Sequence, residues 1–348
     1  MREEKRNLKT YVNEILTPAA EVLHEHDKKV VGPSATVEWW GWDMDVAING
    51  DPTTYDGEAW GAKFGLDNWL EYQDAWKHID VLSLHYLKGD VNVAKKHKGG
   101  DSMIPLLDHV YEKYIEPGRL EGIYLTEEGL TENDDKTALE PWEQNDPTQW
   151  LPQYIIPVLD WSIRHDWTTT DQFKLFWYNM NYDRNDKNRP LEPTMLLDRD
   201  NTADNTLRKS SMGETLTALT DLLTGADSVT LITDRVTVGY DITDEDASSF
   251  ESQYAFLVNY SIFVASWADP KEEADESVEV LIKDIDIGTV RDVVTVDYQT
   301  GERMELSYGD GYEWIDRGTG SRPDTILATL PATNAPVKYL WIDRKLNA

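Results

Sequence analysis

The feature that most constrains the fold of this chain is a change in the period of its apolar residues near residue 225. Before that point, short apolar runs alternate with longer segments whose apolar residues recur at i, i+3, i+4 and i+7, the spacing of one helix face. The short runs lack a polar residue at every second position, which is typical of strands covered on both faces of a parallel sheet. The expected strands are 29–35, 79–87, 122–128 and 173–180, and the expected helices are 5–26, 103–115, 150–165, 206–225 and one that begins at Leu66.

Beyond residue 225 the helical period gives way to short apolar runs separated by turn residues, such as Thr300-Gly301. This pattern predicts antiparallel strands joined by hairpins. The expected strands are 254–267, 277–282, 291–306, 325–330 and 336–342. We therefore expect an α/β domain of about four β/α units at 1–225, followed by an antiparallel β-sandwich domain at 226–348.

The composition excludes several classes of partner. The chain carries 33 Lys and Arg against 65 Asp and Glu, a formal net charge of −32, and such a surface repels nucleic acid and anionic membranes. The absence of cysteine excludes disulfides and thiolate nucleophiles, and His24 and His26 point apart on a helix, so we expect no metal site. The sequence has no glycine-rich phosphate loop, no signal peptide and no long apolar run. We expect no cofactor, no nucleic acid partner and no membrane partner; an upstream signal peptide would make the protein secreted or periplasmic.

The acidic residues are spread along the chain, which indicates a salt-adapted surface. Repulsion between unscreened carboxylates destabilises a fold at low ionic strength, and about 1 M salt shortens the screening length to about 3 Å. We predict that the melting temperature, measured by scanning calorimetry, rises between low and molar NaCl. A flat or falling melting temperature over that range would contradict salt adaptation.

Parallel α/β folds gather functional side chains at the carboxyl ends of their strands. The expected strand 122–128 ends in Thr-Glu-Glu, so its two carboxylates stand at the strand exit. The chain also has 14 Trp and 17 Tyr against 6 Phe, and rings with a polar edge suit the apolar face of a sugar. The four strand ends offer Glu38, Trp39, Trp40, Trp42, His85, Tyr86, Glu127, Glu128, Trp177 and Asn179. A carboxylate, a His-Tyr pair and several tryptophans would then share one rim, and the aromatic composition is a hint of sugar binding.

Four motifs, VVGPSA, IDVLSLHY, IYLTEEG and LFWY, resemble in order and spacing strands five to eight of the retaining glycoside hydrolases of clan A. These enzymes are (β/α)8 barrels, often followed by a β-sandwich, and the resemblance covers about residues 5–225. It implies a hydrolase of β-linked poly- or oligosaccharide in which Glu127 is the nucleophile. It also implies that His85 and Tyr86 line the subsite around the scissile bond, and that Trp177 floors the sugar.

The remaining expected substrate-binding residues are Trp39, Trp40 and Asn179. Retaining hydrolysis needs one ionised carboxylate that attacks the anomeric carbon, and a second carboxyl about 5 Å away that protonates the leaving oxygen. A Tyr hydroxyl or an imidazole that donates a hydrogen bond to the nucleophile would keep it ionised.

The second carboxyl is the point where the sequence departs from the clan. There the acid/base Glu follows an Asn just before the helix that precedes the VVGPSA strand, and in this chain that helix is the first element. Asn13-Glu14 lies inside the helical pattern, away from the apolar stripe, so we expect a solvated pair. We therefore expect the second half of a (β/α)8 TIM barrel without the acid/base, and a partner that supplies the missing N-terminal half. Glu38 is the alternative acid/base.

Other interpretations of the same residues stay open. Glu127 could be a surface carboxylate at a turn, as we expect for Glu128, and His85 could be a core histidine. The tryptophans at the strand ends could serve packing alone. The alternative function is a non-catalytic carbohydrate-binding or scaffold protein that keeps an aromatic rim without two carboxyls.

Overall fold

The computed structural model describes two compact units. One comprises Met1–Ala138 with Asp166–Thr194, and the other Leu139–His165 with Met195–Ala348. This division groups the helices at 150–164 and 211–223 with the C-terminal strands. The domain boundary that the sequence predicts near residue 225 stays a prediction. The described residues are 8–36, 60–88, 103–130, 147–167, 171–177, 196–199, 207–240, 242, 250, 252–267, 277–315, 324–331 and 337–345.

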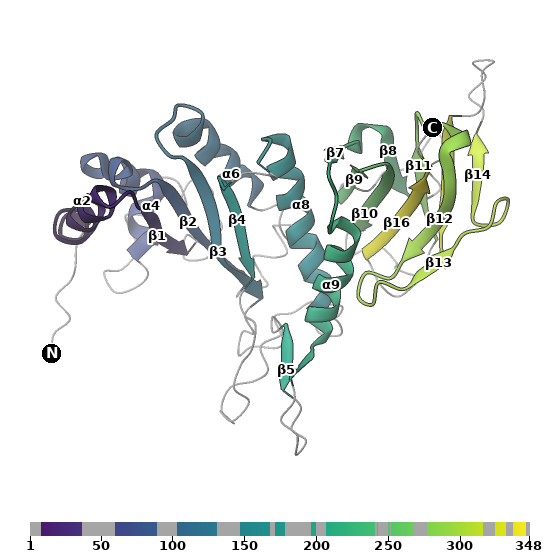
Figure 1. Ribbon diagram of the computed structural model, residues 1–348, viewed down its shortest axis with the longest axis horizontal. Helices are drawn as coiled ribbons and strands as arrows, with labels where there is room; N and C mark the ends of the chain where they lie inside the picture. Colours follow the sequence, from purple (N-terminus) through teal and green to yellow (C-terminus); the bar gives the residue numbers. More distant parts are fainter. Residues whose placement is uncertain are drawn as a thin grey trace. The chain divides into compact units, whose positions relative to one another are not determined.

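The first unit is a parallel sheet with helices between its strands (Figure 1). Its elements are α1 (Leu8–Thr10), η1 (Tyr11–Leu16), α2 (Thr17–Glu25), β1 (Val31–Thr36), α4 (Trp60–Glu71), η3 (Tyr72–His78), β2 (Val81–Lys88), α6 (Ile104–Val110), η5 (Tyr111–Ile115), β3 (Gly122–Leu130) and β4 (Phe173–Trp177). The strands lie in the order β1-β2-β3-β4, all parallel. A doubly wound sheet reverses its order, whereas consecutive strands of a (β/α)8 barrel keep chain order. The sheet therefore has the arrangement of half such a barrel.

The first expected helix is present from Leu8 to Glu25. Its hydrogen bonding changes from the π to the α pattern at Thr17, directly before Pro18, which has no N–H to donate. Val12, Leu16 and Ala20 of the apolar stripe are buried, whereas Asn13 and Glu14 are exposed. The prediction that this pair is solvated is confirmed.

The two faces of the sheet differ in composition. One face carries Leu82, Leu84, Ile123 and Leu125, which are fully buried. The register of the paired strands assigns Val31, Ser83, Tyr124, Lys174 and Phe176 to the other face. On that face the two outer positions are open, because Val31 is 45% exposed and Phe176 is 48% exposed.

Gly122 begins β3 at a point where the chain has no room for a side chain. A Cβ at this position would overlap the carbonyl oxygen of Gln172, just before β4, whereas a Cβ at Gly32 on β1 would meet nothing within 4 Å. We predict that Gly122→Ala lowers the free energy of unfolding by about 1–3 kcal/mol, because backbone must move to relieve the overlap. Urea titration measures the difference, with Gly32→Ala as the matched control. Equal midpoints for the two variants would contradict this packing.

The second unit contains two large antiparallel sheets, a small two-stranded antiparallel sheet, and helices. Its elements are η7 (Pro147–Gln149), α8 (Trp150–Arg164), β5 (Leu197–Arg199), β6 (Leu207–Lys209), α9 (Ser211–Leu223), β7 (Val229–Leu231), η8 (Thr233–Arg235), β8 (Val236–Gly239), β9 (Ser252–Val258), β10 (Ser261–Trp267), β11 (Val278–Ile282), η9 (Ile287–Thr289), β12 (Val290–Val296), β13 (Arg303–Glu305), β14 (Tyr312–Ile315), β15 (Thr325–Leu330) and β16 (Val337–Arg344). The strand orders are β13-β12-β16-β10-β9-β7 and β14-β15-β11-β8, and β5 pairs with β6.

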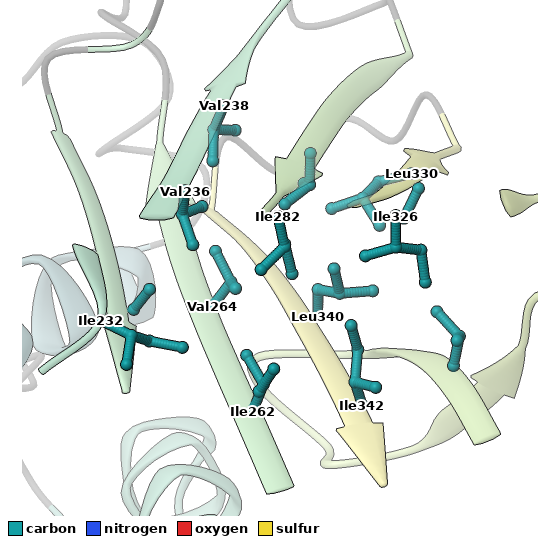
Figure 2. Close-up of a cluster of buried hydrophobic side chains, with 14 of the residues drawn as sticks. Ile232, Val236, Val238, Ile262, Val264, Ile282, Ile326, Leu330, Leu340 and Ile342 are labelled. Carbon is teal, nitrogen blue, oxygen red and sulfur yellow. The ribbon is translucent and has the colours of Figure 1, made fainter. Parts of the chain in front are cut away.

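The two larger sheets enclose one apolar core. Figure 2 shows Val264 and Leu340 from the six-stranded sheet beside Ile282 and Ile326 from the four-stranded sheet, and all four side chains are buried. Two antiparallel sheets with a shared core form a sandwich. The predicted fold class, a half barrel followed by an antiparallel β-sandwich, is therefore confirmed.

Two elements of the second unit differ from the sequence prediction. The helix expected from residue 206 begins at Ser211, because the Ser210 hydroxyl accepts the N–H of Gly213 at 3.0 Å and caps the helix there. The preceding Leu207–Lys209 forms β6 instead. The run 254–267 contains two strands, because Asn259 has φ 54° and turns the chain between β9 and β10.

Candidate active site

The carboxyl ends of the four parallel strands meet at one edge of the sheet. Two rows of paired Cα atoms cross this edge. The first row pairs Thr36 on β1 with His85 on β2, and His85 with Glu127 on β3. The second row consists of Tyr86, Glu128 and Trp177. Both carboxylates that the sequence singles out therefore belong to paired strand positions, in adjacent rows.

Strand β3 is irregular directly before these rows. Leu84 pairs with Leu125, and the next residue of β2, His85, pairs with Glu127, so Thr126 is an extra residue with no partner position on β2. The pairing with β4 shifts at the same place, between Leu125 and Glu128. An extra residue of this kind is a β-bulge, and bulges are rare between parallel strands and frequent beside active sites.

A pair of hydroxyl groups lies at the bulge. The Oγ1 atom of Thr126 is 2.6 Å from the Oγ of Ser83 and donates to the carbonyl oxygen of Leu84 at 3.3 Å. Either hydroxyl can donate in the shorter contact, and donation by Ser83 leaves the Thr126 proton for the carbonyl of Leu84. The side chain of Ser83 is 1% exposed, so this polar link between β2 and β3 is inside the protein.

The same face carries a small aromatic group toward β4. The Tyr124 ring lies 6.3 Å from the Phe176 ring and 5.2 Å from the ammonium of Lys174, and its hydroxyl donates to the carbonyl oxygen of Asp171 at 2.9 Å. A hydrogen bond with Asp171 raises the pKa of Lys174. A cation and two rings thus line the open side of the sheet.

The predicted site residues divide into three groups. His85 and Trp177 are described and partly buried. Glu127, Glu128 and Tyr86 are described as positions in the strand ladder. The predicted residues Glu38, Trp39, Trp40, Trp42 and Asn179 lie outside the described residues. The hydroxyl pair of Ser83 and Thr126 was missed by the sequence analysis, although small polar residues inside otherwise apolar strands are a signal of it.

The described residues contain no cluster of three or more His, Asp or Glu side chains that could hold a metal ion. Within the same residues, none of the helices combines the length and the apolar character needed to cross a membrane.

Three solved structures align with most of this chain. A β-porphyranase of glycoside hydrolase family 86 from the human gut bacterium Bacteroides plebeius has a TM-score of 0.51 and 14% identity, over 97% of this chain and 52% of its own. In fold, the chain is similar to about half of a glycoside hydrolase. BuGH86, solved in complex with neoagarooctaose, has a TM-score of 0.50 and 12% identity, and the alignment covers 98% of this chain and 47% of BuGH86. The GH51 arabinofuranosidase from Xanthomonas axonopodis pv. citri has a TM-score of 0.49 and 11% identity, and the alignment covers 94% of this chain and 63% of the arabinofuranosidase.

The resemblance to clan A glycoside hydrolases that the motifs predict is confirmed at the level of the fold. No protein-family model and no curated protein sequence matches the chain. The chain spans between 47% and 63% of the length of these three structures. At such low identities, the two structures with TM-scores of 0.50 and 0.51 show the fold alone, and the substrate and the site residues are proposals.

Proposed function

We propose that this chain carries the nucleophile and the sugar-binding side of a retaining glycoside hydrolase that cleaves β-linked poly- or oligosaccharide. Glu127 is the nucleophile in this proposal, and His85 stands beside it. The other proposed substrate contacts are Tyr86, Trp177, Trp39, Trp40 and Asn179. The acid/base carboxyl comes from a complementing segment of about four β/α units.

The single observation that carries the proposal is the pairing of Glu127 with His85 at the carboxyl edge of a singly wound parallel sheet. Directly paired residues project to the same side of a sheet, and so do residues two apart on one strand. His85 is two residues from Ser83, so Glu127 is assigned to the face opposite the fully buried apolar one. Glu128 pairs with Tyr86 and is assigned to the other side. In a barrel the face away from the helices is the inner one, which favours Glu127 over Glu128 as the nucleophile.

The proposed reaction has two displacements. In the first, the Glu127 carboxylate attacks the anomeric carbon, the bond to the leaving oxygen breaks, and that oxygen takes a proton from the acid/base carboxyl. In the second displacement, the acid/base group, now a carboxylate, removes a proton from water. The water oxygen attacks the anomeric carbon, and the bond to Glu127 breaks and releases it as a carboxylate. The sugar therefore leaves with its original anomeric configuration.

The need for a complementing segment follows from the open side of the sheet. Among the described strands, β1 pairs only with β2, and β4 pairs only with β3. The exposed Val31 and Phe176 stand on those two outer strands. Unpaired edges and exposed apolar side chains are features that a closed barrel buries. Four further strands would pair with the two sheet edges and bury the two exposed apolar side chains.

One observation favours a second candidate, a non-catalytic carbohydrate-binding or scaffold protein. Among the described residues of β1 to β4, the carboxylates are the adjacent Glu127 and Glu128 of β3, so no neighbouring strand among these supplies a carboxyl that faces Glu127 as acid/base. A protein that binds sugar without cleaving it needs no second carboxyl.

Covalent trapping separates the two candidates. A dinitrophenyl 2-fluoro-β-glycoside has a leaving group that needs no protonation, so a chain without the acid/base can still be labelled. A panel of such glycosides (glucose, galactose, mannose and xylose) is incubated with the chain alone and with a complementing segment, and labelled peptides are mapped by mass spectrometry. We expect a label on Glu127 that is lost in Glu127→Gln and kept in Glu128→Gln. No label with any sugar, with or without the segment, would favour the non-catalytic candidate.

A further inference from the structure

We infer that the hydroxyl pair of Ser83 and Thr126 is a positioning device, which holds the bulge in β3 and thereby keeps Glu127 opposite His85. The inference deepens the proposed function and rests on it for the role of Glu127. The bulge and the hydroxyl contacts themselves do not depend on that role.

The first step concerns the hydrogen-bond ladder. An extra residue interrupts the regular spacing of N–H donors between two strands, and a buried carbonyl without a donor is costly. The Thr126 hydroxyl donates to the carbonyl oxygen of Leu84, on the residue of β2 just before the shift in pairing. The side chain of the extra residue thus supplies a donor at the place where the ladder changes register.

The second step concerns direction. Ser83 is 1% exposed, and its hydroxyl oxygen lies 2.6 Å from that of Thr126, so this hydrogen bond restrains the rotation of the Thr126 side chain. Ser83 pairs with Tyr124, two residues before Thr126 on β3, so the hydrogen bond runs diagonally along one face. This contact holds Thr126 on the Ser83 face and leaves the next residue, Glu127, as the partner of His85.

The third step is what happens without the device. If β3 ran on without an extra residue, His85 would pair with Thr126, and Tyr86 would pair with Glu127. A slip of one residue moves a side chain to the opposite face of a sheet. Glu127 would then leave the face of Ser83 and His85, and the site would lose its nucleophile without any loss of the carboxyl itself.

Cysteine cross-linking measures the register without any activity. The chain has no cysteine of its own, so the two introduced thiols have no native thiol to react with, and the monomeric product reports the cross-link within one chain. The double variant His85→Cys/Glu127→Cys reports the bulged register, and Tyr86→Cys/Glu127→Cys reports the regular one. We expect mild oxidation to close the first pair about tenfold faster than the second, because disulfides require neighbouring Cβ atoms that face each other.

Adding Thr126→Val, which keeps the shape of the side chain and removes its hydroxyl, is expected to shift cross-linking toward the second pair. Thr126→Ser keeps the hydroxyl and should retain the original preference. Thr215→Val is the matched control, because the fully buried Thr215 hydroxyl donates to a backbone carbonyl in the second unit. An unchanged ratio in Thr126→Val would overturn the inference.

Trapping then tests the consequence for the proposed nucleophile. In Thr126→Val we expect the first-order labelling rate at Glu127 to fall about 100-fold, as for a misplaced reacting group, with the dissociation constant of the glycoside unchanged. Thr126→Ser should restore the rate, whereas a loss of stability alone would follow the melting temperature. Equal labelling rates in the unaltered chain and in Thr126→Val would overturn the positioning role. An unaltered chain that takes no label would remove the proposed function and leave the register to be decided by the cross-links.

Discussion

Glu127→Gln is expected to lower the turnover of the completed glycosidase by about four orders of magnitude or more, which is the scale for removing a covalent nucleophile. Glutamine has the shape of glutamate but cannot attack the anomeric carbon, so the two-step route is lost. The first displacement and the hydrolysis of the glycosyl-enzyme both disappear. Initial rates on an aryl β-glycoside measure the effect.

Glu128→Gln is the matched control for this prediction. The two residues are adjacent on β3, and their Cα atoms pair with His85 and Tyr86, respectively. A neutral isostere at either position should leave the melting temperature close to that of the unaltered chain, since both lie at the end of a strand. If Glu128→Gln lost turnover and Glu127→Gln kept it, our assignment of the nucleophile would be wrong.

The fold could be predicted from the sequence wherever a long pattern repeats. In β2 and β3, the apolar residues Leu82, Leu84, Ile123 and Leu125 are fully buried, and the lack of a polar residue at every second position identified these runs as strands of a parallel sheet. Short elements were missed for the opposite reason. Strands β7, β8 and β14 have three or four residues each, too few to establish a period. Their place is set by the neighbouring strands with which they pair.

The candidate site was predictable only in part. The end of a strand can be located from its apolar run, and this is how Glu127 and His85 were found. Their relative register could not be predicted, because it depends on the bulge at Thr126, and a threonine in a bulge looks the same in sequence as one in a regular strand. The contact that marks the bulge joins Ser83 to Thr126, 43 residues apart. The sequence shows a small polar residue in each apolar strand, but it does not show that the two residues meet.

A buried carboxylate links helical segments of the first unit that are far apart in the sequence. Asp67 on α4 accepts hydrogen bonds from His109 at 2.9 Å, from Lys113 at 2.6 Å and from the Tyr114 hydroxyl at 2.9 Å. These three donors belong to α6 and η5, so a single acceptor ties two segments that are more than 40 residues apart. Asp67 itself is only 8% exposed.

The protonation of Asp67 therefore links stability to pH. Burial opposes ionisation, but the hydrogen bonds from the three donors outweigh it and hold the pKa of the Asp67 carboxyl below its usual value. A group whose pKa is lower in the folded state stabilises the fold fully above its unfolded pKa, which is about 3.9 for aspartate. That stabilisation is lost as the pH falls from this value through the folded pKa.

We predict that Asp67→Asn lowers the free energy of unfolding by about 3 kcal/mol at neutral pH, because it removes the charge that Lys113 faces and weakens one buried and two part-buried hydrogen bonds. The difference in the free energy of unfolding between Asp67→Asn and the unaltered chain should become smaller below about pH 4, where the native carboxyl also becomes neutral. Urea titrations at pH 7 and in acid measure both values. Asp74→Asn is the control, since Asp74 pairs with Lys77 at 2.5 Å on the exposed surface, where a lost ion pair has little effect on stability. Equal free energies of unfolding for Asp67→Asn and Asp74→Asn at neutral pH would contradict this prediction. The contacts of Asp67 with η5 would then not stabilise the fold, and the lowered pKa of Asp67 would need another cause.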